Sequence, residues 1–222
     1  MTIKKKDFVE IEYTGRLKES NEVFDTTDEK TAKEAQIWSD KGEYKPVVIC
    51  IGEAHILKGI DEFLEGKEPG VHKIELSAEK AFGKKDPKKM IMIPSNKFAE
   101  QGIKPVPGLR LNIDGFVGTV KTVTGGRCVV DFNHPLSGRD VVYDLKINKV
   151  VADKKAQVEA LLKVLLGIRD PKVDVKEKKA TITFPAEAPQ QLLDELGKKI
   201  KEVTDIDVEF AIEKNSNAEK KK

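Results

Sequence analysis

The side chains that most often serve as metal ligands or nucleophiles are few and scattered in this sequence. Its three histidines, His55, His72 and His134, lie far apart and lack the spacing of a metal site. Cys50 and Cys128 each lie inside an apolar run, which favours buried thiols over a disulfide framework and fits a reducing cytosol. We therefore expect neither a metal site nor a disulfide.

Other motifs that could bind a charged ligand also have simpler explanations. Gly115-Phe-Val-Gly118 and Gly125-Gly126 lie among strand-like runs, without the strand-loop-helix context of a phosphate-binding loop. The run Glu219-Lys-Lys-Lys222 is typical of a solvated chain end. These segments predict turns and a polar tail.

A further set of residues admits two interpretations. Taken singly, Tyr13, Val47, Ile56 and Ile60 are ordinary core residues, and Asp25 is a cap for the turn Asp-Thr-Thr-Asp. Taken together, they would form an apolar pocket with a small number of polar contacts. Residue type alone leaves both interpretations open.

The elements that must position these residues begin with short strands. Phe8–Gly15 alternates, with Val9, Ile11 and Tyr13 on one face, which is typical of a half-buried strand. The other elements expected before residue 86 are a strand ending at Val23-Phe24, a helical excursion over 31–38, a strand over 47–51, a helix over 60–64 and a strand over 71–77. This order predicts an antiparallel sheet around one short helix.

Residues 86–135 have the pattern of a small β-rich unit. We expect strands over 90–93, 109–113, 115–123 and 127–132, and a helix over 95–101 that is capped by Ser95. The Gly125-Gly126 pair between two alternating runs indicates a hairpin. The strand expected over 140–150 resembles the earlier sheet, so 86–135 are an insertion into a domain formed by 1–85 and 136–151.

Residues 152–214 predict a separate α+β unit with the order αββαβ. We expect helices over 154–166 and 188–203 and strands over 172–176, 180–184 and 207–212, followed by a flexible tail over 215–222. A unit of this size cannot easily cover all of its own apolar faces. The unit is therefore expected to mediate self-association as a homodimer through apolar residues that include Leu161, Leu162, Leu165 and Leu166.

Composition excludes several classes of partner. The 222 residues include 40 Lys and Arg against 38 Asp and Glu, a net charge of +2, and no basic stripe interleaved with aromatics is present. We therefore expect no nucleic-acid partner. The sequence contains no apolar run near the roughly 18 residues that a membrane helix requires and no signal-like leader, so we expect no membrane partner and a cytoplasmic location.

Three segments in the first half resemble one family when they are read together. They are Tyr13-Thr-Gly15 with Val23-Phe-Asp25, Ile51-Gly-Glu-Ala-His-Ile-Leu-Lys-Gly59 with Phe63-Leu-Glu-Gly66, and Ala81-Phe-Gly83. In order and spacing they resemble the FKBP-type peptidyl-prolyl isomerases. The continuation Asp131-Phe-Asn-His-Pro-Leu-Ser-Gly138 is similar to the SlyD branch, in which a chaperone domain is inserted in the flap, and the C-terminal unit is similar to the long archaeal form.

The resemblance implies an α+β fold: an FKBP-like antiparallel sheet wrapped on a short helix, a β-rich insert in the flap and a C-terminal α+β domain. It also implies the roles of the site residues. The catalytic set would be Tyr13, Asp25, Phe82 and Tyr143, and the substrate-binding set Phe24, Val47, Ile56, Leu57 and Ile60. Ile60 stands where many members have Trp, and Phe82 replaces a Tyr, so the pocket departs from the family pattern at two positions.

The chemistry implied is rotation about the X-Pro bonds of unfolded or nascent polypeptides. A twisted amide loses the resonance that separates charge, so an apolar pocket favours it over the planar form, and no nucleophile, metal or cofactor is required. The insert would grip apolar segments of the polypeptide through residues among Met90, Ile91, Met92, Ile93, Phe98, Phe116 and Val117, of which several must instead form its core. The alternative function is a binding chaperone whose isomerase pocket is largely idle.

Overall fold

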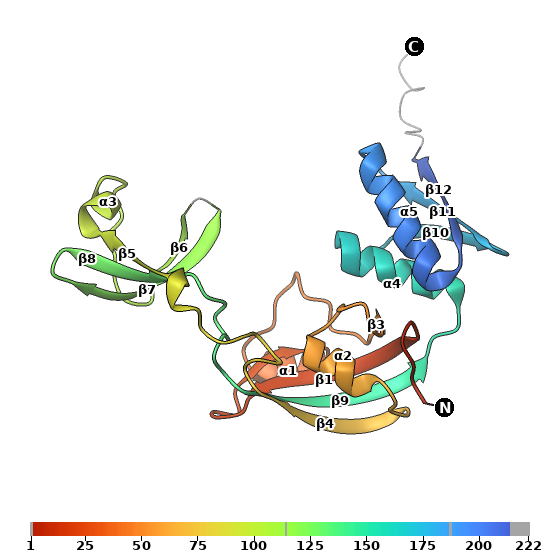
Figure 1. The fold of residues 1–222 in the computed structure, drawn as a ribbon, viewed down its shortest axis with the longest axis horizontal. Helices are drawn as coiled ribbons and strands as arrows, with labels where there is room; N and C mark the ends of the chain where they lie inside the picture. The colour runs from red at the N-terminus through yellow and green to blue at the C-terminus, as the bar shows by residue number, and fades with distance from the viewer. Residues whose placement is uncertain (1, 114, 187, 214–222) are drawn as a thin grey trace, which may run out of the picture. The chain divides into compact units, whose positions relative to one another are not determined.

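The computed structural model describes residues 2–113, 115–186 and 188–213 (Figure 1). These residues form two compact units. The first contains the residues up to Arg16, Ser20–Ile74 and the residues from Val142 on, and the second contains Leu17–Glu19 and Glu75–Val141. Among the described residues, no helix is both long and apolar enough to cross a membrane.

The first sheet is built on the alternating segment at the N-terminus. Its strands are β1 (Phe8–Leu17), β2 (Val23–Thr26), β3 (Val47–Cys50), β4 (Gly70–Leu76) and β9 (Val141–Val150). They follow the order β2-β1-β9-β4, and β3 also pairs with β1. Val9 and Ile11 are fully buried, as the alternation predicts, but Phe8 on the other face is buried too. The start of β1 is therefore covered on both faces, because the C-terminal residues pack against Phe8.

Two short helices occupy the connections of this sheet. Helix α1 (Glu29–Glu34) begins where the Asp28 carboxylate accepts a hydrogen bond from the Thr31 backbone N–H at 2.7 Å. This cap starts the helix slightly earlier than the composition of 31–38 predicts. Helix α2 (Lys58–Leu64) buries Ile60 and Leu64 on one face.

In the second unit, the described residues of the insert form a four-stranded sheet over a small core. The order is β5 (Met90–Pro94), β8 (Arg127–Asp131), β7 (Phe116–Thr124) and β6 (Arg110–Ile113). A short 3-10 helix η1 (Pro87–Lys89) precedes β5, and α3 (Ser95–Ala99) follows it. Gly125 and Gly126 have φ of +56° and +72°, so the predicted β7–β8 hairpin is confirmed together with its turn residues.

One local prediction in the insert is wrong. Ser95 does not cap α3, since the N-cap position belongs to Pro94 and has no side-chain hydrogen bond. The Ser95 hydroxyl lies 3.3 Å from the buried Cys128 thiol instead. The backbone at Pro94 already has the extended conformation that precedes a helix, which moves the helix start by one residue.

The C-terminal residues fold in the predicted αββαβ order. Helix α4 (Lys154–Leu166) starts at the Asp153 cap and ends at Gly167, which has φ of +66°. Strand β10 (Lys172–Lys176) is antiparallel to β11 (Lys179–Phe184), and β12 (Asp207–Ile212) is parallel to β11. Helix α5 (Gln190–Thr204) makes the crossover that a parallel pair requires.

The apolar face of α4 is covered within the chain. Leu161 and Leu162 are fully buried in a core that also contains Phe8 and Cys50 from the first sheet. Leu166 is half-buried against the same core, and Leu165 remains 43% exposed. The expectation that all four leucines are available to a second chain is therefore wrong, because residues of β1 and β3 help to cover Leu161 and Leu162.

Candidate functional site

Four of the predicted site residues form a cluster on three neighbouring strands. We call it the Tyr13 cluster; its members are Tyr13 on β1, Phe24 and Asp25 on β2, and Tyr143 on β9. The antiparallel register of β1 and β2 pairs Gly15 with Asp25. The Tyr13 hydroxyl donates a hydrogen bond to Asp25 Oδ2 at 3.0 Å. The Tyr143 ring meets Phe24 edge-on with centroids 5.7 Å apart, and its centroid lies 5.9 Å from that of Tyr13.

The rings close over Gly15. A Cβ at this position would lie 2.8 Å from Phe24 Cζ and 2.8 Å from Tyr143 Cε1, which is closer than nonbonded carbons approach. Glycine is therefore required for this ring contact. In the sequence, Gly15 stands out only as part of the motif Tyr13-Thr-Gly15, and that motif is the signal for its steric role.

Burial raises the pKa of both tyrosines of the Tyr13 cluster. For Tyr13, desolvation is the main cause, followed by the charge of Asp25 and the hydrogen bond to it. For Tyr143, desolvation again comes first and the Asp25 charge second. Both hydroxyls therefore remain protonated at neutral pH and can serve as hydrogen-bond donors.

The structure separates the two interpretations of Asp25. Capping of the turn and the following helix belongs to Asp28, whose carboxylate accepts the Thr31 N–H. Asp25 is exposed, and its carboxylate accepts the Tyr13 hydroxyl. Two hydrogen bonds join Thr27, which follows β2, to Tyr13. The Thr27 backbone N–H donates to the Tyr13 carbonyl at 2.9 Å, and the Thr27 hydroxyl accepts the Tyr13 backbone N–H at 2.9 Å.

Three more predicted residues come from the loop after β3 and from α2. Ile56 and Leu57 are half-buried, and Ile60 is completely buried. The loop is shaped from within by Asp61, which accepts hydrogen bonds from the Gly52 N–H at 2.9 Å and the Ala54 N–H at 3.2 Å. Asp61 is itself buried, so α2 and the loop form one hydrogen-bonded piece.

Two further predicted residues, Val47 and Phe82, have the following neighbours. Val47 lines a cavity of about 250 Å³ together with apolar residues of α4, among them Ala156 and Ala160. Phe82 belongs to the second unit, where its ring stacks on His134 with centroids 4.7 Å apart and its carbonyl accepts the Ser137 hydroxyl.

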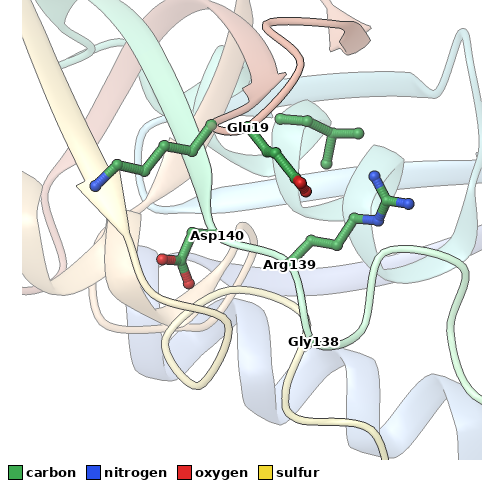
Figure 2. A pocket seen from close by; sticks show the side chains of 6 residues that line it. Glu19, Gly138, Arg139 and Asp140 are labelled. Carbon is green, nitrogen blue, oxygen red and sulfur yellow. The ribbon is translucent and has the colours of Figure 1, made fainter.

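A larger cavity, of about 500 Å³, lies between the loop after β1 and the loop before β9 (Figure 2). It is lined by Leu17, Lys18, Glu19, Gly138, Arg139 and Asp140. Figure 2 shows the charged ends of Glu19, Arg139 and Asp140 around this hollow. Charged, solvated walls do not desolvate an amide, and none of the predicted site residues lines this cavity.

Each histidine has a local explanation. His55 Nδ1 accepts the Cys50 backbone N–H at 3.1 Å, His72 Nε2 lies 2.9 Å from the Glu68 carbonyl, and His134 stacks on Phe82. Within the residues that the structure describes, no group of three or more His, Cys, Asp or Glu side chains could hold a metal ion.

The insert separates its apolar residues into a core and an exposed set. Phe98 is buried with Val120, Cys128 and Val130, and Ile93 is half-buried against them. These two residues are therefore unavailable for gripping a polypeptide. The remaining candidates, which we call the exposed insert set, are between 43% and 70% exposed: Met90, Ile91, Met92, Phe116 and Val117.

Comparisons with known proteins agree with this arrangement. The sequence profile of the family described as FKBP-type peptidyl-prolyl cis-trans isomerase matches residues 1–104, and that of "FKBP26, IF domain" matches residues 91–136. The second match falls on the insert.

Three curated relatives are named as peptidyl-prolyl cis-trans isomerases. The short-type peptidyl-prolyl cis-trans isomerase of Methanocaldococcus jannaschii is 31% identical over 149 residues, which is 67% of this chain and 94% of the relative. The FKBP-type 16 kDa peptidyl-prolyl cis-trans isomerase of Escherichia coli is 26% identical over 50% of this chain and 78% of its own length. The FKBP-type peptidyl-prolyl cis-trans isomerase SlyD of Haemophilus influenzae is 28% identical over 53% of this chain and 62% of its own length.

These profile matches cover β1 and β2, which carry Tyr13, Phe24 and Asp25, and also the loop before α2 and the insert, whereas Tyr143 on β9 lies beyond them. The α+β fold with antiparallel sheets is the one that the sequence predicts. The chain belongs to the FKBP-type peptidyl-prolyl cis-trans isomerases.

Proposed function

We propose that this isomerase acts on X-Pro bonds of unfolded or nascent polypeptides by stabilising the twisted amide without a covalent step, and that its insert captures those polypeptides. The observation that carries the proposal is the Tyr13 cluster: an aromatic wall closed over Gly15, with a tyrosine hydroxyl held by Asp25 at its edge. The proposed site adds Ile56, Leu57 and Ile60. Val47, which lies beneath α4, is not part of it.

The physical basis is the polarity of the amide. Resonance gives the planar C–N bond a rotational barrier of about 18–20 kcal/mol and separates charge between oxygen and nitrogen. Rotation to the twisted form removes that resonance, so the transition state is less polar than the ground state. Aromatic and aliphatic walls therefore bind the twisted amide better than the planar one, and differential binding of this kind lowers the barrier.

Polar groups at such a site orient the substrate. The Tyr13 hydroxyl uses its single proton on Asp25, so the carboxylate fixes the orientation of the phenol. Among the residues that the structure describes, the Leu57 backbone N–H donates no backbone hydrogen bond. We assign this N–H as the hydrogen-bond donor to a substrate carbonyl. The Phe82 side chain cannot donate such a bond because it lacks a hydroxyl.

The insert offers an edge strand with apolar residues on both of its faces. Successive strand residues point to opposite faces, and Met90, Ile91 and Met92 are consecutive and all exposed. Strand β5 also lies at one edge of its sheet. An extended apolar segment can pair with such an edge through its backbone, and flexible methionines adapt to different side chains. This supports capture of unfolded chains through residues 86–135.

Self-association remains a proposal with a smaller surface than the sequence suggests. Burial of Leu161 and Leu162 leaves Val164, Leu165, Leu192 and Ile212 as the exposed apolar residues of the C-terminal part of the described chain. These are separate side chains on α4, α5 and β12. A dimer through this part is testable by sedimentation of the full chain at micromolar concentration, where a monomer contradicts it.

The experiment that tests the proposed activity is a protease-free measurement of cis/trans rates on a proline tetrapeptide with the full chain. We expect catalysis, and an idle pocket predicts rates no faster than those without protein. The pH-rate profile should be nearly flat from about pH 6 to 8 because no general acid or base takes part. A bell-shaped profile in this range contradicts the noncovalent mechanism.

A further inference from the structure

The loop between β3 and α2, residues 51–57, holds an unfavourable backbone conformation; we call it the pocket loop. Gly52 has φ of +88° and Ala54 has φ of +54°. The left-handed region costs an L-residue such as Ala54 free energy, so the loop keeps this shape only if neighbouring groups hold it. From the inside, Asp61 holds it through the Gly52 and Ala54 N–H groups.

A second contact holds the pocket loop from the outside. Glu53 forms an ion pair with Lys199 on α5. The Glu53 side chain is only 12% exposed and that of Lys199 is 35% exposed, so this pair is far more shielded than the other ion pairs of the C-terminal part, such as Lys179–Glu209 at 69% and 66%. The hydrogen bond to Glu53 is the first cause of the raised pKa of Lys199.

Helix α5 also contacts Lys6, whose backbone is hydrogen-bonded to Ile51 at the start of the pocket loop. Lys6 Nζ lies 3.5 Å from Glu202 on α5, and the Lys6 backbone N–H donates to the Ile51 carbonyl at 2.9 Å. On the side facing the core, Ile200 of α5 is buried in the same cluster as Cys50, the last residue of β3. Helix α5 therefore holds both sides of Gly52.

We infer that Lys199 and Glu53 are positioning residues for the isomerase site, and that the C-terminal αββαβ part acts in catalysis by holding the pocket loop. The inference rests on the proposed function, because Ile56 and the Leu57 N–H are presented by this loop. The pair acts through the loop, and neither residue touches the substrate.

The expected consequence follows from the burial of Glu53. Removal of Lys199 leaves a shielded carboxylate without its cation, and such a group turns toward water when its backbone allows it. The backbone here is a loop already in an unfavourable conformation, so outward movement of Glu53 relaxes it. That movement displaces Ile56 and Leu57, which follow within four residues in the sequence.

The test uses the full chain with four single substitutions. Lys199→Met removes the cation, Lys199→Arg keeps it, and Glu53→Gln removes the negative charge with little change in shape. Lys179→Met is the matched control, since Lys179 pairs with Glu209 on the same part of the chain at an exposed position away from the loop. The readouts are kcat/KM on a proline tetrapeptide, the urea midpoint, and amide hydrogen exchange of residues 52–57.

We expect Lys199→Met and Glu53→Gln each to lower kcat/KM by roughly threefold to thirtyfold, as for residues that act on a site through intervening structure. Exchange in the pocket loop should rise, while the urea midpoint stays close to that of the control. Lys199→Arg should restore kcat/KM to within about twofold, because Arg keeps the charge. The double variant Lys199→Met with Glu53→Gln should be no worse than either single variant.

The outcomes separate this inference from the proposed function. If the unmodified chain does not catalyse isomerisation, the proposed function fails. If it does, and Lys199→Met and Glu53→Gln both match Lys179→Met in activity and loop exchange, only the inference fails. A loss of activity in Lys199→Met that Lys199→Arg does not restore also overturns it. Should Lys199→Met not fold, Glu53→Gln decides the question, because it leaves the cation partly solvated.

Discussion

The Tyr13 cluster and the exposed insert set are both apolar, but they use apolar side chains differently. In the Tyr13 cluster, Tyr143 is buried, its neighbours Tyr13 and Phe24 are half-buried, and the phenol of Tyr13 is held by Asp25. In the insert, Met90, Ile91 and Met92 are exposed in succession on an edge strand. The Tyr13 cluster holds rigid rings in a defined geometry, and the exposed insert set leaves flexible side chains in contact with water.

Under the proposed function, this difference corresponds to a division of tasks. Orientation of an amide requires groups whose positions are set before the substrate arrives, and two-angle aromatic side chains packed against Gly15 meet that need. Capture of many different polypeptides requires side chains that adjust to each one, and unbranched methionines do so. Separate damage to the two regions should therefore produce separate defects.

The largest effect is expected from replacing residues 86–132 with a short linker. Asn133 receives the Asp86 N–H at 2.9 Å and donates to the Asp86 carbonyl at 3.1 Å, so the two ends of the insert already lie together and a short linker can join them. Proline-limited refolding of an unfolded protein should slow by about a hundredfold, because the site loses the local concentration that capture provides.

Tetrapeptide isomerisation is the control for this variant and should be preserved, since a tetrapeptide is too short to need capture. The rates to compare are the slow refolding phase of the unfolded protein and the tetrapeptide cis/trans rate, each with and without the insert. Equal refolding rates in the two proteins would refute the capture role.

Asp25→Ala tests the other side of the comparison. The substitution removes the acceptor of the Tyr13 hydroxyl. Loss of such a hydrogen bond costs on the order of 1–3 kcal/mol when the remaining group is left unsatisfied, so kcat/KM on a tetrapeptide should fall about tenfold to a hundredfold. Asp25→Asn keeps an acceptor oxygen for the Tyr13 hydroxyl and should lose less. Complete loss of activity in a stable Asp25→Ala protein would show that the carboxylate takes part in the chemistry.

Substitution within the exposed insert set should have a smaller and more selective effect. We expect the pair Met92→Ser with Phe116→Ser to slow proline-limited refolding severalfold, because each exposed side chain is one of several that share the contact. Tetrapeptide rates should not change. Ile212→Ser is the matched control, since Ile212 is similarly exposed but lies on β12, outside the insert. A control that slows refolding equally would make the effect nonspecific.

The smallest expected effect concerns pH and the pocket loop. Burial is the main cause of the lowered pKa of His55, assisted by Lys199 and opposed by the charges of Glu53 and Asp61. The unfolded chain therefore binds a proton more readily than the folded one as the pH falls below the ordinary histidine value of 6.5. The contribution of His55 to stability is intact above pH 6.5 and is lost as the pH falls through the lowered folded value.

The measurement is the urea midpoint between pH 7.5 and 5. His55 Nδ1 accepts the Cys50 N–H, and Asn can present an oxygen at nearly the same place, so His55→Asn removes the titration and keeps the acceptor. The decline of the midpoint toward acid pH should be shallower in this variant. An identical decline in the two proteins would assign the pH dependence to other groups.

Local patterns in the sequence predicted most elements closely. The sequence pattern placed a helix at 154–166, the bounds that α4 has, and the Gly125-Gly126 pair placed the β7–β8 hairpin. Where two local signals competed, the sequence did not rank them. Asp25 and Asp28 lie at the two ends of the Asp-Thr-Thr-Asp segment before α1, and only Asp28 is the cap of that helix. Pro94 and Ser95 are neighbours at the start of α3, and only Pro94 occupies the N-cap position.

For the site, the sequence determined which residue types occur in which order, and that was enough to predict the family and the members of the Tyr13 cluster. It could not assign a surface to an apolar residue. Phe98 and Phe116 are equally apolar in the sequence, yet one is buried in the insert and the other is 70% exposed. Period and spacing report the face of an element, but burial depends on what packs against that face.

The same reason accounts for what only the tertiary structure decided. Leu161 and Leu162 of α4 are covered by Phe8 and Cys50, and Glu53 meets Lys199, although these partners are separated by half of the chain or more. No local period encodes a contact between segments so distant, because it depends on how whole elements pack. By itself the sequence determined most of the elements and the family, and tertiary packing decided which apolar faces stay open and which lysine pairs with Glu53 of the pocket loop.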